Sequence, residues 1–272
     1  MRQHKKGVIL GREWDADEYE VLSAPQTRWG VEVLGRLDVR GDEVAIDAGC
    51  GTGRVTKLLL AKLPEGSVLA IDGSRAMVEA ARKRFAGELR VRVERQDLLS
   101  LEVDEPVDLV FSTATFHWIL DHDRLFGNLA RALKPGGRLV AQCGGEGNIS
   151  CATKATKETM EQERFRDYFV GWKDDKYYAD AKSTSRRLEA AGFEEVETWL
   201  HDEVAAFGSV DELARFLAAV VLGAHMERLP EGERGPFAAA VAAKVAAVDG
   251  NPALDYVRLN IMARVVQRGR RY

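Results

Sequence analysis

The chain has 272 residues, 46% of them hydrophobic and 30% charged, which suits one large domain or one domain with an elaborated cap. Its net charge of −4 and isoelectric point near 5.9 argue against a nucleic-acid partner, which would need a basic face. No apolar run reaches membrane-spanning length, and the three cysteines have no metal-ligand spacing. We therefore expect a soluble, cytoplasmic protein with reduced thiols, no metal and no membrane partner.

From residue 44 onward, short β-branched runs alternate with amphipathic helical segments. The alternation predicts strands at 44–48, 67–72, 89–94, 107–113 and 138–143, and helices at 54–63, 75–86 and 123–133. This succession predicts a doubly wound, mostly parallel α/β sheet, in which ligands bind beyond the carboxyl ends of the strands.

The remainder of the chain is richer in helices. The pattern predicts helical segments at 151–172, 183–192 and 209–249, the last divided by the turn-rich 229–236, and strands at 194–204 and 255–266. We expect four parts: a helical lid (1–40), a core (41–201), a helical cap insertion (202–254), and the last strand with its tail (255–272).

The segment IDAGCGTGR (46–54) joins the first strand to its helix and contains glycines at 49, 51 and 53. A dinucleotide fingerprint would need glycine where Arg54 stands, and the chain contains no Gly-Lys-Ser or Gly-Lys-Thr of a phosphate-binding loop. Asp47, two residues before the first of these glycines, would repel a pyrophosphate and attract a ligand with cationic character.

Three carboxylates, Asp47, Asp72 and Asp97, fall at or just after the first three strands, and this topology brings them to one crevice. Asp72 is placed to accept from a ribose diol and Asp97 from an exocyclic amine, with Met77 and Leu98 on either side of a flat base. A cofactor with an adenine, a ribose, an ammonium and a sulfonium fits such a site. S-adenosylmethionine has these groups.

VAIDAGCGTGR, IDGS, QDL and LKPGGRLVAQ resemble the motifs of class I S-adenosylmethionine-dependent methyltransferases, over about residues 40 to 145. The resemblance implies a seven-stranded Rossmann-like sheet with a helical cap and S-adenosylmethionine as the cofactor. The cofactor-binding residues expected in the core are Asp47, Gly49, Cys50, Gly51, Gly53, Asp72, Gly73, Met77, Asp97, Leu98 and Ser112.

A narrower resemblance lies in EWDADEYE (13–20), SAPQTR (23–28), FHWILDHDRLF (116–126) and YVRL (256–259). These segments are similar to trans-aconitate methyltransferases, which methylate a carboxylate of a small polyacid. The resemblance implies that Trp14, Tyr19, Gln26 and Arg28 close over the methionine end of the cofactor.

His117 follows the fourth strand, where it would serve as a general base or as a donor to a carboxylate; a packed core histidine is the alternative. Trp118, Tyr177, Tyr178 and Arg258 are the candidate acceptor-binding residues, with core packing or surface ion pairing as their alternatives.

The expected activity is methyl transfer to a small-molecule acceptor, a carboxylate oxygen of a small organic acid. N-, O- or C-methylation of another metabolite or natural product is the alternative reaction, and a non-catalytic cofactor-binding protein is the alternative class. The sequence leaves the number of subunits open.

Overall fold

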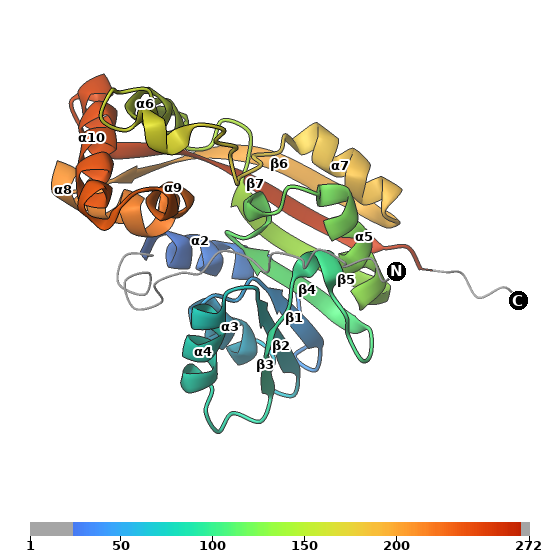
Figure 1. The fold of residues 1–272 in the computed structure, drawn as a ribbon. Coiled ribbons are helices and arrows are strands. Elements are labelled where there is room, and N and C mark those ends of the chain that lie inside the picture. Colours follow the sequence, from blue (N-terminus) through green and yellow to red (C-terminus); the bar gives the residue numbers. More distant parts are fainter. Residues whose placement is uncertain (1–23, 268–272) are drawn as a thin grey trace, which may run out of the picture.

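The computed structural model describes residues 24–267, built around one seven-stranded sheet (Figure 1). The strand order is β3-β2-β1-β4-β5-β7-β6. The strands are β1 (Val44–Ala48), β2 (Ser67–Asp72), β3 (Val91–Arg95), β4 (Val107–Thr113), β5 (Leu133–Gly144), β6 (Phe193–Ala206) and β7 (Ala253–Val265).

The first five strands pair in parallel, and β7 pairs antiparallel with both β5 and β6. The predicted doubly wound, mostly parallel seven-stranded sheet with a helical cap is therefore confirmed. Strand β1 lies between β2 and β4, so the chain winds away from it in both directions. A crevice at the carboxyl ends of β1 and β4 is where such sheets bind their ligands.

Helices cover both faces of the sheet because alternate strand residues are apolar on opposite sides. Ala45 and Leu109 pack in the cluster beneath α2 (Ala24–Leu34) and α3 (Arg54–Ala61), with α4 (Arg75–Arg84) beside them. Ile46 and Val110 point the other way, toward α5 (His122–Ala132) and α7 (Ala181–Ala190).

The cap gathers around one end of the long β6–β7 pair (Figure 1). It consists of α6 (Ser150–Met160), α8 (Val210–Phe216), a π-helical turn (Leu217–Val221), α9 (Gly223–Arg228) and α10 (Glu231–Asp249). One apolar cluster holds it together, with Phe165, Phe169, Phe216 and Phe237 as its large buried side chains.

The structure differs from the sequence-based expectations in the cap. The turn expected at 229–236 is mostly the start of α10, whose first turn carries Glu231 and Glu233 and so complements the helix dipole. Segment 150–172, placed with the core by the sequence, packs in the cap cluster. The expected boundary at 201/202 falls inside β6.

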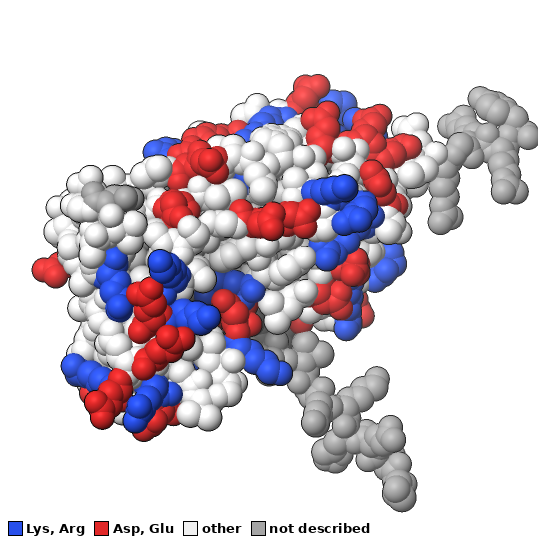
Figure 2. Space-filling model, turned by 90° about the horizontal axis from the view of Figure 1, so that it is seen from above, with Lys and Arg blue, Asp and Glu red and all other residues white. Residues whose placement is uncertain are grey.

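Acidic and basic side chains are interspersed on the face shown in Figure 2, and no large part of that face is basic alone. Within residues 24–267, every helix is too short or too polar to cross a bilayer.

Candidate active site

The glycine turn after β1 is tied to the neighbouring strand by its backbone. The N–H groups of Gly49 and Cys50 both donate to the carbonyl oxygen of Ile71, at 2.8 and 2.9 Å. An added Cβ at Gly49 would lie 2.0 Å from Thr115 Oγ1, and one at Gly53 would lie 2.5 Å from the Phe85 ring. These two glycines are therefore required by packing.

Gly51 differs from its two neighbours. It also has a left-handed φ of +54°, but an added Cβ would meet no described atom within 4 Å. The space beside Gly51 is open, so a ligand can approach the backbone of this residue closely.

Two carboxylates stand beside this open space. Asp47 is buried at the end of β1 and accepts from Thr56 Oγ1 at 2.6 Å. Burial raises the pKa of Asp47 to about 7, the charge of Asp72 adds to the rise, and the Thr56 hydrogen bond opposes it. Asp72 accepts the N–H groups of Gly51 and Ser74 at 2.9 and 2.8 Å.

The third carboxylate, Asp97, follows β3 and accepts from the Leu99 N–H at 2.9 Å with Oδ1. A carboxylate has about four acceptor positions, and within the described residues the bond from the Leu99 N–H occupies one of those of Asp97. Three carboxylates at strand ends beside an open glycine fit a guest with hydroxyls, an amine and positive charge. The residues present therefore fit S-adenosylmethionine.

The other cofactor candidates of the core have structural partners. Ser112 Oγ donates to the Ala48 carbonyl at 2.6 Å and so fastens β4 to β1, and the Gly73 carbonyl accepts from Arg95 at 2.9 Å. Met77 and Leu98 are buried. Burial raises the pKa of the Cys50 thiol well above its usual value, which makes it a poor nucleophile. Contact of these residues with the cofactor stays a prediction.

A small cavity of about 40 Å³ lies just beyond β4, and we call it the acceptor chamber. Ala114, the residue before the Thr115 that packs on the glycine turn, is part of its wall. The predicted residues His117, Trp118, Tyr178 and Arg258 meet here. The other residues of its wall are Asn148, Ile149, Lys176, Val220, Val221 and Tyr256.

His117 is buried in the chamber wall on a short 3₁₀ turn (Phe116–Trp118). Its Nδ1 accepts the Gly144 N–H at 3.3 Å. Burial lowers the pKa of His117 well below its usual range, and the positive charges of Arg258 and Lys176 lower it further. The ring is therefore neutral at pH 7.

Two cationic side chains belong to the same wall. Arg258 is buried on β7, donates to Gln142 Oε1 at 3.3 Å, and lies 4.4 Å above the Trp29 ring. Lys176 lies 5.0 Å from the Trp118 ring and pairs with Asp175 at 2.9 Å. The chamber thus offers positive charge to an anionic group.

Adjacent tyrosines face different surroundings. Tyr178 lines the chamber, and burial raises the pKa of its hydroxyl, which stays protonated. Tyr177, also expected to wall the acceptor pocket, lies outside the chamber: its ring packs 4.9 Å from His122 and its hydroxyl accepts from Arg187. That expectation is wrong for the chamber, because successive residues of an extended segment point to opposite sides.

The chamber wall contains unusual backbone. Ala114 and Ile149 have positive φ values of 56° and 46° although neither is glycine. Val220 and Val221 lie in the π-helical turn. Strained residues and π turns are typical of functional sites, and a β-branched residue in the left-handed region is a genuine outlier.

Of the four predicted lid residues, Arg28 is the one whose side chain the structure describes. Trp14 and Tyr19 lie outside the described residues, and so does the side chain of Gln26, in the first turn of α2. Arg28 is half exposed and pairs with Glu203 at 3.0 Å and Glu32 at 4.0 Å. The bond to Glu203 joins α2 to β6.

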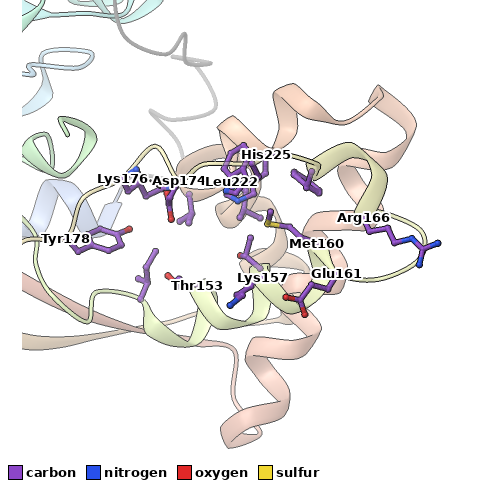
Figure 3. A pocket seen from close by; sticks show the side chains of 16 residues that line it. Thr153, Lys157, Met160, Glu161, Arg166, Asp174, Lys176, Tyr178, Leu222 and His225 are labelled. Atoms are coloured by element: carbon purple, nitrogen blue, oxygen red, sulfur yellow. Dashed lines mark hydrogen bonds and ion pairs between the residues drawn. The ribbon is translucent and has the colours of Figure 1, made fainter. Parts of the chain in front are cut away.

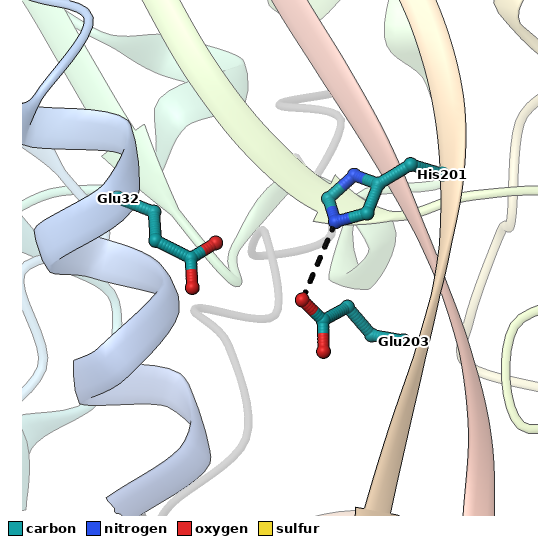
Figure 4. A group of neighbouring side chains, drawn as sticks. All are labelled: Glu32, His201 and Glu203. Atoms are coloured by element: carbon teal, nitrogen blue, oxygen red, sulfur yellow. Dashed lines mark ion pairs between the residues drawn. The ribbon is translucent and has the colours of Figure 1, made fainter.

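Figure 4 shows Glu32 of α2 facing His201 and Glu203 of β6, and one ligand-type atom of each lies within 4.8 Å of the others. Arg28 pairs with both carboxylates, and the second ring nitrogen of His201 lies 3.1 Å from the Asn260 amide. Arg28 therefore offsets one of the two negative charges of this cluster, in which Glu32 is exposed and His201 and Glu203 are partly buried.

Comparison with known proteins agrees with this geometry. Residues 45–137 match the sequence profile of a methyltransferase domain. A trans-aconitate 2-methyltransferase of Methylobacterium nodulans is 38% identical over 130 residues, which are 48% of this chain and 49% of that protein. A trans-aconitate 2-methyltransferase of Sinorhizobium fredii is 29% identical over 92% of this chain and 98% of its own.

Among solved structures, a phosphoethanolamine N-methyltransferase 2 of Haemonchus contortus in complex with S-adenosyl-L-methionine superposes with a TM-score of 0.59 at 19% identity. The superposition covers 93% of this chain and 57% of that one, and at this identity it shows a similarity of fold alone.

The matched domain, the sheet and the glycine turn with its carboxylates are those of a class I S-adenosylmethionine-dependent methyltransferase. S-adenosylmethionine is its cofactor. Within the class, its curated relatives named above are trans-aconitate 2-methyltransferases.

Proposed function

We propose that this enzyme transfers the methyl group of S-adenosylmethionine to a carboxylate oxygen of a small organic acid. The observation that carries the proposal is the charge and the tautomer of the His117 ring. Its neutral ring uses Nδ1 as an acceptor for the Gly144 N–H, so its proton is on Nε2. The ring can donate a hydrogen bond to an acceptor but has no free lone pair with which to take up a proton.

A carboxylate is the acceptor that suits such a chamber. It is already ionised at neutral pH and needs no general base, whereas an alcohol or an ammonium group must lose a proton before it attacks. What a carboxylate needs is donors and positive charge. His117, Arg258 and the protonated Tyr178 hydroxyl supply these from the chamber wall.

When bound, S-adenosylmethionine supplies an electrophilic methyl carbon carried on a sulfonium. A carboxylate oxygen could accept this methyl group without loss of a proton, and the sulfur would leave as a neutral thioether. The residues of this chain hold the two reactants in line and exclude water from them. The names of the curated relatives support an acid acceptor, because trans-aconitate is a carboxylic acid.

The test is an assay with methyl-labelled S-adenosylmethionine against matched panels of carboxylic acids, amines and phenols. The expected product is a base-labile methyl ester, formed with a rate at saturating cofactor that is flat between about pH 6 and 9. Label recovered in an amine or an ether, with the acids inert, would overturn the proposal. Cofactor binding without transfer to any panel would favour a non-catalytic role instead.

A further inference from the structure

A second and much larger cavity adjoins the acceptor chamber inside the cap (Figure 3). We call it the cap chamber. The two cavities share Ile149, Lys176, Tyr178 and Val221 in their walls. The cap chamber has a volume of about 530 Å³, within the range of small-molecule sites, whereas the 40 Å³ of the acceptor chamber holds a few waters. A carboxylate fits the smaller space, and the rest of an organic acid must extend elsewhere.

The inner wall of the cap chamber is apolar. Phe169, Val221 and Leu222 are buried there, and Met160 and Trp172 complete a largely hydrocarbon and aromatic surface. The Trp172 ring lies 4.3 Å from the ring of His225, so this wall also presents flat aromatic faces. A surface of this kind favours apolar groups that leave water.

The charged side chains of the cap chamber lie mostly at its exposed margin. Four of the five, Lys157, Glu161, Arg166 and Asp174, are exposed, and they are two basic and two acidic. The fifth, Lys176, is largely buried in the wall shared with the acceptor chamber and pairs with Asp175. In Figure 3, Tyr178 and Lys176 lie at one end of the chamber and Arg166 at the other. The four exposed charges at the margin sum to zero and face water. They therefore add little to the binding free energy of a second carboxylate on the acceptor.

We propose that the cap chamber holds the apolar tail, an alkyl chain or an aromatic ring, of the acid whose carboxylate occupies the acceptor chamber. The proposal rests on the proposed function and specifies its substrate class as hydrophobic monocarboxylic acids, in place of a compact polyacid. The matched methyltransferase domain ends at residue 137, before every residue of the cap chamber, so its match carries no information about the tail.

The test compares butyrate, octanoate, 3-phenylpropionate and trans-aconitate as acceptors for labelled methyl. The acceptor KM is expected to fall by about fourfold for each methylene buried, so octanoate is preferred over butyrate.

Thr153 is exposed on α6 and lines the chamber, so Thr153→Trp fills it with little risk to folding. This variant is expected to raise the KM of octanoate and 3-phenylpropionate about tenfold or more and to affect butyrate much less, because the short tail of butyrate reaches only the start of the cap chamber. Lys154→Trp, the next residue and outside the cap chamber, is the matched control and is expected to change neither.

Two outcomes overturn the inference while leaving the proposed function intact. One is efficient methylation of trans-aconitate with octanoate no better than butyrate. The other is an equal loss for butyrate and octanoate in Thr153→Trp. If no acid accepts the methyl group, the proposed function fails. Calorimetry of octanoate with the S-adenosylhomocysteine-loaded enzyme then decides the tail site separately: binding that Thr153→Trp weakens supports it, and absence of binding overturns it.

Discussion

Asp47, a predicted cofactor-binding residue, has a pKa raised by its burial. Its pKa of about 7 in the folded protein lies above the value of about 3.9 expected in the unfolded chain. The folded state therefore binds this proton more tightly, and the stability that Asp47 contributes is present at low pH and is lost as the pH rises from about 4 through 7. A cationic ligand has the opposite preference, because it is attracted to the ionised carboxylate.

We therefore expect the affinity for S-adenosylmethionine to rise between pH 6 and 8. At pH 6 about a tenth of Asp47 is ionised, so the dissociation constant is expected to be about tenfold larger than at its plateau. Calorimetric titration of the enzyme across this range measures it. Asp47→Asn, which keeps the size of the side chain, is expected to abolish the dependence; a wild-type affinity independent of pH would show that the cofactor does not require the charge of Asp47.

His117 is expected to act on the acceptor and not on proton transfer. His117→Ala removes the donor from a buried anion, which raises the acceptor KM about 10- to 100-fold and leaves the shape of the kcat–pH profile unchanged. His117→Gln retains a side-chain donor and is expected to recover part of the loss. Steady-state kinetics at saturating cofactor give both parameters. An acidic limb in the wild type that disappears in His117→Ala, with acceptor binding intact, would identify a general base instead.

At the scale of elements, α2 connects the N-terminal part of the described chain to the acceptor chamber. Gly30 lets it approach α3, since an added Cβ there would lie 2.7 Å from Val55. One residue earlier, the buried Trp29 ring lies against the Arg258 guanidinium and 4.6 Å from the Tyr256 ring. The helix therefore sets the orientation of a cation that faces the acceptor.

Replacing Trp29 by Leu is expected to raise the acceptor KM by about 3- to 30-fold, because the buried cation–π contact with Arg258 is lost. The affinity for S-adenosylmethionine is expected to change little, since the carboxylates of the predicted cofactor site lie on other elements than α2. Trp29→Phe, which keeps an aromatic face, is the control for loss of volume. A larger effect on cofactor affinity than on acceptor KM would mean that α2 serves the cofactor site.

The core strands and their helices were predictable from sequence because short runs rich in β-branched residues alternate with amphipathic segments. Strand β4 was predicted with the bounds that the structure has. The start of α10 was not, because Pro236 and two glycines resemble a turn until the packing of Phe237 against the cap is known. His117, Trp118, Tyr178 and Arg258 were predicted to serve the acceptor and do meet in one chamber.

Lys176, Asn148 and Ile149 were missed for a physical reason. Asn148 and Ile149 lie in an irregular segment bonded to the distant β7, as by the bond from the Val257 N–H to Asn148 Oδ1 at 3.0 Å. Lys176 lies in another irregular segment, where the Tyr177 N–H donates to the His117 carbonyl at 2.9 Å. For the same reason the sequence could not tell which of the adjacent Tyr177 and Tyr178 faces the chamber. A residue of β7, Tyr256, was also missed, since an aromatic in a strand is more often core.

At the scale of the whole molecule, the predicted cofactor site and the proposed acceptor site lie in different parts of the chain. The glycine turn and its carboxylates belong to the sheet edge between β1 and β3, whereas the cap chamber is built from α6, segment 166–178 and residues 221–225. Hydrogen exchange is therefore expected to show two separate patterns. Cofactor alone should slow exchange in residues 47–53 and 72–77, and addition of an acid should slow it in 149–178 and 217–225. Protection by the acid that is confined to the core would contradict this division.

The insertion of α8 to α10 between the last two paired strands has a consequence for how the enzyme can change. Strands β6 and β7 pair from Phe193 with Val265 to Ala206 with Ala253. The pairing of the two strands is therefore complete at the residues where the inserted segment begins and ends. Segment 207–252 can therefore be exchanged for that of a relative, or varied in a library, with β5–β7 pairing and the cofactor edge left untouched. New acceptor ranges are accessible by substitution there and in α6, at little cost to the chemistry that all acceptors share.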